Sequence, residues 1–262
     1  ALFLSFRILD IADLTTDGCF VLGMCVSIVC TLNNHPLLGI FMGMVSGGLA
    51  GLVTALLQTK LGVPSILAGI VTNTALYTIN LMVMGFSSNI SILRNKTIFN
   101  GNKLLLLVLI VVVAMILLRY FLSTRLGLSI RATGDNIDMV SASSINPKAC
   151  ILIGLVMSNM LTGLGGALAG QLQKSADINA GNGIVTIGLA TLIIGETVIN
   201  GKKSITRNII ACLIGNIIYR LIYAFILQTH IIPIECLKLM TALIITLAIA
   251  LPYLKDRKKA LC

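Results

Sequence analysis

Charged residues are scarce in this chain of 262 residues, where Asp, Glu, Lys and Arg together make up only 11%. Soluble domains carry about 25% charged residues. Because 57% of the residues are hydrophobic and the mean hydropathy is +1.01, the composition excludes a soluble globular protein. We therefore expect an all-α polytopic membrane protein.

The chain also lacks the short motifs of common catalytic and metal sites. Its two histidines, His35 and His230, fall in predicted loops, and none of its seven cysteines forms a Cys-x-x-Cys pair. No Gly-x-Ser-x-Gly sequence and no phosphate-binding glycine-rich loop is present. We therefore predict that the chain is not an enzyme, binds no metal ion or cofactor, and leaves ATP hydrolysis to a separate subunit.

Long apolar runs recur along the chain, and a helix needs about 20 apolar residues to cross a bilayer. We predict eight spans, at residues 19–32, 36–58, 63–85, 104–122, 149–170, 183–200, 209–229 and 236–254. Residues 2–9 are apolar but too few to cross. Since the sequence begins with Ala1 and not Met, we interpret them as the end of a span that starts earlier.

Positive charge lies mostly on one side of these predicted spans. Thirteen of the nineteen Lys and Arg residues fall in segments that we assign to one face: Arg7, Lys60, Arg119, Arg125, Arg131, Lys148, Lys202, Lys203, Arg207, Lys255, Arg257, Lys258 and Lys259. Cytoplasmic loops of membrane proteins are enriched in Lys and Arg. We therefore place these segments and the C-terminus in the cytoplasm, in a bacterial cell membrane. The basic residues are not interleaved with aromatic ones, so nucleic-acid binding is not expected.

Two stretches of the chain resemble each other. Residues 43–80 and 154–200 each contain a small-residue helix (GGLAG, GGALAG), a linker, and a span that ends Ile-Asn. In the predicted topology the two copies run in opposite directions, and inverted repeats of this kind build transport pathways. We expect one permease domain over 1–262, with halves at about 1–122 and 149–254. The alternative is that Gly- and Ala-rich helices resemble each other by composition alone.

Polar residues interrupt several of the apolar segments. Broken backbone at membrane depth survives only where protein or a cavity shelters it from lipid, and ionisable groups there are functional candidates. We predict breaks at 10–17, 71–75 and 195–197, whose side chains converge on one pathway for a polar solute. The candidate pathway residues are Asp13, Asp17, Thr72, Asn73, Thr74, Glu196 and Arg220. The alternatives are that the hydroxyl and amide groups join helices together, and that Arg220 belongs to a structural ion pair.

A polar segment lies between two spans on the predicted cytoplasmic side. Within the connection at 123–148, residues 136–145 alternate polar and small side chains. A helix that is polar all round is unstable alone, so a partner must cover it. We expect a short helix here, roughly parallel to the membrane; the alternative is a solvated loop.

The sequence of this segment resembles a known motif. Arg-Ala-x-Gly-x-Asn, followed by Ala and then Ser-Ile-Asn, is similar to the coupling loop of ABC importer permeases of the branched-chain amino acid and ribose type. Stretches at 9–23 and 194–215 resemble that family more weakly. The resemblance implies that the loop docks into a cleft of the ATPase subunit through Arg131, Gly134, Asn136, Asp138, Ser141, Ala142, Ser144, Ile145 and Asn146. Ser144 stands where the family usually has glycine, and serine ends a helical turn with more strain.

The resemblance also implies a function and partners. It indicates the permease subunit of an ATP-driven importer for a small polar solute, in the first place an amino acid, with a likeness to permeases for aromatic amino acids such as tryptophan. The expected partners are ABC ATPase subunits, an extracytoplasmic substrate-binding protein, a second permease copy or a homologous permease, and membrane lipid. One alternative is a sugar or nucleoside permease, which shares the coupling pattern. Another is a different class of membrane protein, an intramembrane enzyme or a non-transporting scaffold.

Overall fold

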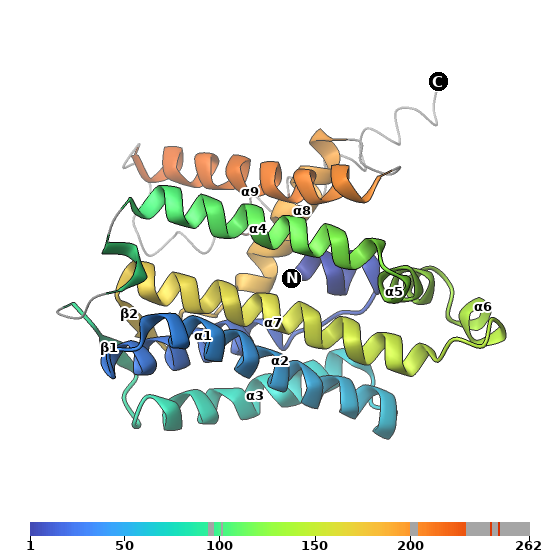
Figure 1. The fold of residues 1–262 in the computed structure, drawn as a ribbon, viewed down its shortest axis with the longest axis horizontal. Coiled ribbons are helices and arrows are strands. Elements are labelled where there is room, and N and C mark those ends of the chain that lie inside the picture. The colour runs from blue at the N-terminus through green and yellow to red at the C-terminus, as the bar shows by residue number, and fades with distance from the viewer. Residues whose placement is uncertain (94–96, 101, 200–203, 229–241, 243–245, 247–262) are drawn as a thin grey trace. The chain divides into compact units, whose positions relative to one another are not determined.

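The computed structural model describes residues 1–93, 97–100, 102–199, 204–228, 242 and 246. The chain forms two compact units, Ala1–Asn182 and Gly183–Cys262. The elements of the first unit are η1 (Phe3–Ile8), α1 (Thr16–Leu32), α2 (Pro36–Leu61), α3 (Ser65–Val83), β1 (Asn89–Ser91), η2 (Ile98–Asn100), α4 (Lys103–Ser123), α5 (Arg125–Asp135), α6 (Ile137–Ala142), α7 (Pro147–Gln173) and β2 (Ser175–Asp177) (Figure 1). The second unit contains α8 (Ile184–Val198) and α9 (Ile205–Gln228).

The helices confirm an all-α polytopic membrane protein. Within the described residues, α2, α3, α4, α7 and most of α9 are long and apolar enough to cross a membrane, while α1 and α8 are shorter apolar helices. Each of these seven helices coincides with a predicted span, whereas the predicted span at 236–254 lies outside the described residues. The helix α5 was not predicted, because its polar and basic composition was interpreted as part of a connecting loop.

Glycines bring α1, α2 and α7 into close contact. A Cβ atom added at Gly163 of α7 would overlap the carbonyl oxygen of Gly43 in α2, and one added at Gly166 would overlap that of Phe20 in α1. One added at Gly51 would lie only 2.7 Å from the Cβ atom of Asn159. Small residues allow membrane helices to approach until their backbones touch. These three helices are therefore the packed core of the first unit.

The contacts between α2 and α7 fix their relative direction. Gly43 lies beside Gly163 near the start of α2, and Gly51 lies beside Leu155 further along it. As the residue numbers of the contacts rise along α2, the residue numbers of their partners fall along α7. The two helices are therefore antiparallel, as the proposed inverted repeat requires. The helices that follow them, α3 and α8, belong to different units, so superposition of the two halves stays a prediction.

A small sheet and a buried amide fix one end of this core. The strands β1 and β2 pair antiparallel, with Ile90 opposite Ala176, and Ala176 packs against the end of α1. The fully buried Gln171 donates its Nε2 hydrogens to Ser27 Oγ at 3.0 Å and to the Pro36 carbonyl oxygen at 2.7 Å. These bonds join the ends of α1 and α7 to the start of α2.

Candidate functional site

A buried polar network lies where the chain enters α1. Residues 9–15 are not helical, and Asp10 has a φ of 54°. The first predicted break, 10–17, is therefore confirmed up to residue 15, whereas Thr16 and Asp17 begin α1. The fully buried Asp13 accepts hydrogen bonds from the Thr15 backbone N–H at 2.9 Å and from the Thr15 hydroxyl. Its other oxygen accepts from Asn159 Nδ2 at 2.7 Å, and Thr15 Oγ1 lies 3.1 Å from Thr54 Oγ1. The network therefore ties this break to both α2 and α7.

The glycines explain why this network is possible. Asn159 lies directly against Gly51 of α2, so its amide reaches across the interface where a larger residue on α2 would exclude it. The network is not fully satisfied, because the buried Asn159 Oδ1 atom has no hydrogen-bond partner among the described residues. Most buried polar atoms in proteins do have a partner.

The other predicted pathway residues of the first unit are spread over several environments. Asp17 and Asn73 are half-buried near Gly18, since a Cβ atom at Gly18 would lie 2.5 Å from Asn73 Oδ1. Thr72 is buried but Thr74 is exposed, so these two do not face the same surroundings. The structure therefore groups Asp13 with Thr15 and Asn159, and separates Thr74 from them.

Two predicted helix breaks are wrong. The helix α3 is continuous through 71–75, and within it Thr72 and Thr74 donate their hydroxyl hydrogens to carbonyl oxygens of their own helix, at 2.9 and 2.8 Å. The helix α8 is continuous through 195–197. Its glycine is a packing residue, because a Cβ atom at Gly195 would overlap the carbonyl oxygen of Ala211 in α9.

The ionisable candidates of the second unit differ in exposure. Within that unit Glu196 of α8 is half-buried and Arg220 of α9 is exposed. Arg220 follows Tyr219, which is buried and stacks on Tyr223 with ring centroids 6.4 Å apart.

The predicted coupling segment forms two short helices, not one. Arg131 and Gly134 belong to α5, where the backbone of Gly134 touches Ile8 and Leu9 so closely that a Cβ atom would overlap the Ile8 carbonyl oxygen. Asn136 ends α5 and begins α6, and its Oδ1 atom accepts from the Met139 N–H at 3.0 Å. Asparagine at such a position stabilises the first helical turn.

The short helix α6 confirms the helix expected within 136–145. Its only buried residue is Val140, while Asp138, Ser141 and Ala142 are exposed. Two apolar side chains are exposed as well, since Ile137 has 52% and Met139 69% of its surface accessible. The helix therefore buries one side chain and presents a mixed polar and apolar surface.

The turn after α6 explains one feature of the motif. Ser144 has a φ of 59°, in the left-handed region, which glycine adopts with little cost and other residues do not. Ile145 follows it half-buried, and Asn146 caps α7 by accepting hydrogen bonds from the N–H groups of Lys148 and Ala149. The backbone thus has the conformation that suits the glycine usual in this motif.

Comparison with known proteins identifies the family of the chain. The family of permease components of branched-chain amino acid transport systems matches residues 1–249. The chain belongs to this family. A tyrosine transport system permease protein of Clostridioides difficile (strain R20291) is 33% identical over 246 residues, covering 93% of this chain and 82% of that protein. An uncharacterized protein of Rickettsia prowazekii (strain Madrid E) is 32% identical over 257 residues, covering 95% of this chain and 90% of that protein.

A shorter match connects the chain to a sugar permease. The D-allose transport system permease protein AlsC of Escherichia coli (strain K12) is 35% identical over 104 residues, covering 39% of this chain and 31% of that protein. No solved structure matches the chain. The chain is thus the permease subunit of an ABC-type importer, a multi-pass membrane protein of a transport system.

Sequence reasoning missed several polar residues of the permease core. Thr54, Asn159 and Gln171 are single polar residues within apolar helices, and all three are buried in contacts between helices. A signal was available, because Asn159 lies four residues before Gly163 and therefore on the same helical face. A polar residue in register with glycines of a close-packed face predicts a hydrogen bond across that face.

Proposed function

We propose that this permease imports an amino acid, with an aromatic amino acid as the first candidate. The support is that the tyrosine permease relative aligns along 93% of the chain, whereas the D-allose permease aligns along only 39%. A sugar is the alternative, because that shorter match supports it. In either case the solute would pass beside the non-helical segment that carries Asp13, the start of α1 with Asp17, and the part of α3 that carries Thr72 and Asn73.

We also propose that α6 is the element that receives the movement of the ATPase. The observation that carries this is that α6 is capped at its start by Asn136, precedes the Asn146 cap of α7, and buries one residue, Val140. Force applied to its exposed surface would reach the long helix α7 directly. Arg131 and Gly134 would fix the position of α6 from α5, while Asp138, Ser141, Ala142 and Ser144 would meet the ATPase.

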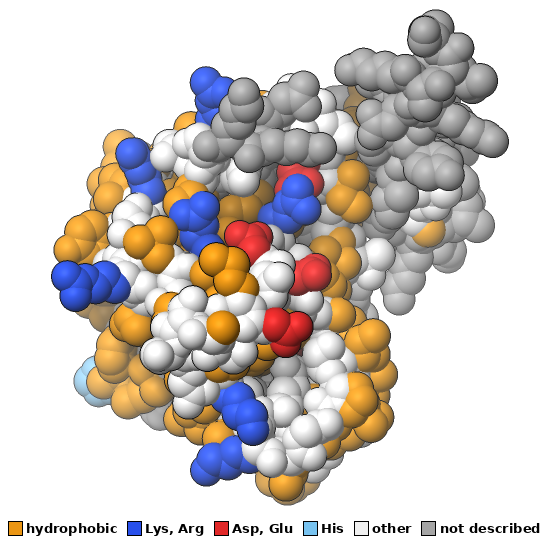
Figure 2. All heavy atoms as spheres, turned by 90° about the vertical axis from the view of Figure 1, so that its right-hand side faces the viewer, with side chains coloured by type: hydrophobic (Ala, Val, Ile, Leu, Met, Phe, Trp, Pro, Cys, Tyr) orange, Lys and Arg blue, Asp and Glu red, His pale blue; other side chains and the backbone are white. Residues whose placement is uncertain are grey.

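The orientation follows from the basic residues. The end of the first unit that carries α5 and α6 also carries the end of α2 with Lys60 and the start of α7 with Lys148. Figure 2 views the molecule from this side, with lysine and arginine side chains at several places on it. We assign this end to the cytoplasm because cytoplasmic segments are enriched in such residues. An extracytoplasmic binding protein would then deliver solute to the opposite end, and a second permease subunit would complete the pathway.

Uptake by the reconstituted importer tests the substrate class. The permease, its ATPase and its binding protein are placed in vesicles, and ATP-driven uptake of labelled tyrosine, leucine and allose is compared. We expect uptake of an amino acid that unlabelled amino acids suppress and allose does not. Uptake of allose with no uptake of any amino acid would overturn the amino-acid assignment in favour of a sugar.

A further inference from the structure

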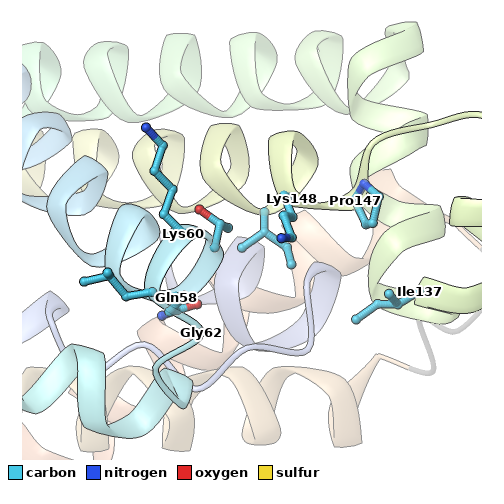
Figure 3. Close-up of a pocket in the computed structure, with 9 residues that line it drawn as sticks. Gln58, Lys60, Gly62, Ile137, Pro147 and Lys148 are labelled. Atoms are coloured by element: carbon cyan, nitrogen blue, oxygen red, sulfur yellow. The ribbon is translucent and has the colours of Figure 1, made fainter.

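A pocket of about 450 Å³ lies at the α6 end of the first unit, between the end of α2 and the start of α7 (Figure 3). Residues 58–62 line it from α2 and the turn after it, Ile137 from α6, and Pro147, Lys148 and Ile151 from α7. Because α2 and α7 are both long enough to span a membrane, the ends where they meet lie near the depth of lipid headgroups.

The lining of this pocket carries positive charge only. Lys60 and Lys148 come to it from two different helices, and none of the nine lining residues is acidic. Among the described residues neither lysine has an ion-pair partner. The end of α2 and the start of α7 carry partial charges of opposite sign, which offset each other. The two ammonium groups therefore make the charge of the pocket lining positive.

A hydrogen-bond donor without a partner also lies in the lining. The Gln58 Nε2 atom is buried and has no hydrogen-bond partner within the part of the chain that the structure describes. A buried donor left unpaired is costly. This amide adds an unsatisfied donor to the wall of a pocket whose two charged groups are both ammonium groups.

We propose that this pocket binds the phosphate of an anionic lipid headgroup. Phosphate oxygens accept from both ammonium and amide groups, and basic pockets between spanning helices on the cytoplasmic side suit such headgroups. The lipid source, as opposed to free phosphate, follows from the neighbouring surface. Leu61 in the lining is 71% exposed, and Ile66 and Leu67 at the start of α3 are 53% and 51% exposed, so acyl chains have an apolar surface beside the pocket. The proposal does not depend on which solute the permease carries.

Lipid binding to the purified permease tests this site. The full chain is purified in detergent, and bound phosphatidylglycerol and phosphatidylcholine are counted by native mass spectrometry during titration. We expect Lys60→Gln with Lys148→Gln to weaken phosphatidylglycerol binding about tenfold, which corresponds to about 1.4 kcal/mol. Replacing both lysines by arginine should retain binding. Both side chains are exposed, so size-exclusion behaviour should not change.

A matched control separates the pocket from general surface charge. Arg119→Gln with Arg125→Gln removes the same charge at the same end of the unit, from exposed residues outside the pocket, and should change binding less than about twofold. Equal losses in the two double variants would overturn the proposal. Displacement of phosphatidylglycerol by an equal concentration of inorganic phosphate would assign the site to a free anion and overturn the lipid source. Release of the lipid when the ATPase is added would overturn it in favour of a protein interface.

Discussion

The helices α4 and α7 resemble each other in length but differ in what surrounds them. The 21-residue α4 is rich in Leu, Ile and Val and is the most apolar of the described spans, yet none of the residues in its most apolar stretch is buried. The 27-residue α7 is less apolar, and half of the corresponding stretch is buried. Within a membrane, the more apolar helix is thus the less buried one.

The difference arises because, in a membrane, moving a large apolar side chain from lipid into a contact between helices gains little free energy. Lipid tails are as apolar as leucine, so contact between helices is driven by close packing and by polar bonds. The helix α7 offers both, through the glycines at 163, 166 and 170 and through Asn159 and Gln171. The effect of a substitution should therefore depend on whether the residue lies on an exposed apolar surface, as in α4, or on a closely packed face, as in α7.

The largest effect is expected from a single methyl group on the glycine face. Gly166→Ala should destabilise the permease by about 3 kcal/mol, because the new Cβ atom overlaps the Phe20 carbonyl oxygen and backbone must move. The measurement is unfolding of the purified protein by increasing fractions of a denaturing detergent.

The neighbouring glycine provides the control for this prediction. The nearest atom to a Cβ at Gly165 is Phe20 Cε2, at 4.0 Å. Gly165→Ala should therefore stabilise the protein by about 0.5 kcal/mol, through the higher helix propensity of alanine. If both variants behave alike, close packing of α1 against α7 does not hold the core together.

The polar bonds of the same face should have the next largest effect. Asn159→Leu removes the hydrogen bond to the buried Asp13 Oδ2, and a buried polar group that loses its partner costs about 2 kcal/mol. Thr74→Val is the control on an exposed surface, where the hydroxyl donates to the Ile70 carbonyl oxygen of its own helix, and it should change stability by less than about 0.5 kcal/mol. An equal loss in both variants would contradict a structural role for the Asp13 network.

The sequence allowed prediction of the spans and of the helix at 137–142 because both depend on local composition. Runs of apolar residues predict the spans, and the polar stretch between two of them, with its likeness to the coupling loop, predicts the short helix. The breaks at 71–75 and 195–197 were predicted wrongly because Thr and Gly were interpreted as interruptions. Thr72 instead satisfies its hydroxyl within α3, by donating to the carbonyl oxygen of Ala68, so a threonine in an apolar helix need not mark a break.

The candidate site was less predictable, because it depends on contacts between distant segments. Asp13 and Asn159 are 146 residues apart in the chain, and no local pattern pairs them. The Gly-rich stretches in α2 and α7 did indicate close packing, but not which polar residues the packing would bring together. The pathway assignments of all seven candidate residues, Glu196 and Arg220 included, stay predictions.

The exposed surfaces of α6 and α4 differ in their chemical character, and an uptake measurement can test what the surface of α6 does. The exposed surface of α4 is apolar and suits lipid, whereas α6 exposes Asp138 and Ser141 beside Met139, which suits a protein partner. Asp138→Leu with Ser141→Leu should reduce uptake by the assembled importer about tenfold, a coupling loss of about 1.4 kcal/mol. Detergent unfolding of the permease should not change, because neither side chain is buried.

The control for this prediction keeps the shape of the surface. Asp138→Asn with Ser141→Ala alters the same positions without adding bulk, and it should retain most uptake. ATPase activity of each complex is measured in parallel, since a failure of coupling leaves hydrolysis running without transport. Normal uptake in the leucine double variant would mean that α6 is only a connector.

The smallest expected effect concerns the turn that joins α6 to α7. Ser144 has a φ of 59°, and a non-glycine residue in this region carries a cost of about 1 kcal/mol that glycine avoids. Ser144→Gly should therefore stabilise the permease by up to about 1 kcal/mol in the same unfolding measurement. Ser143 has a φ of −89°, so Ser143→Gly gains nothing from the turn and loses the hydroxyl bond to the Met139 carbonyl oxygen. A gain of stability in Ser144→Gly together with a loss in Ser143→Gly would support a left-handed turn at Ser144. A loss of stability in Ser144→Gly would contradict it.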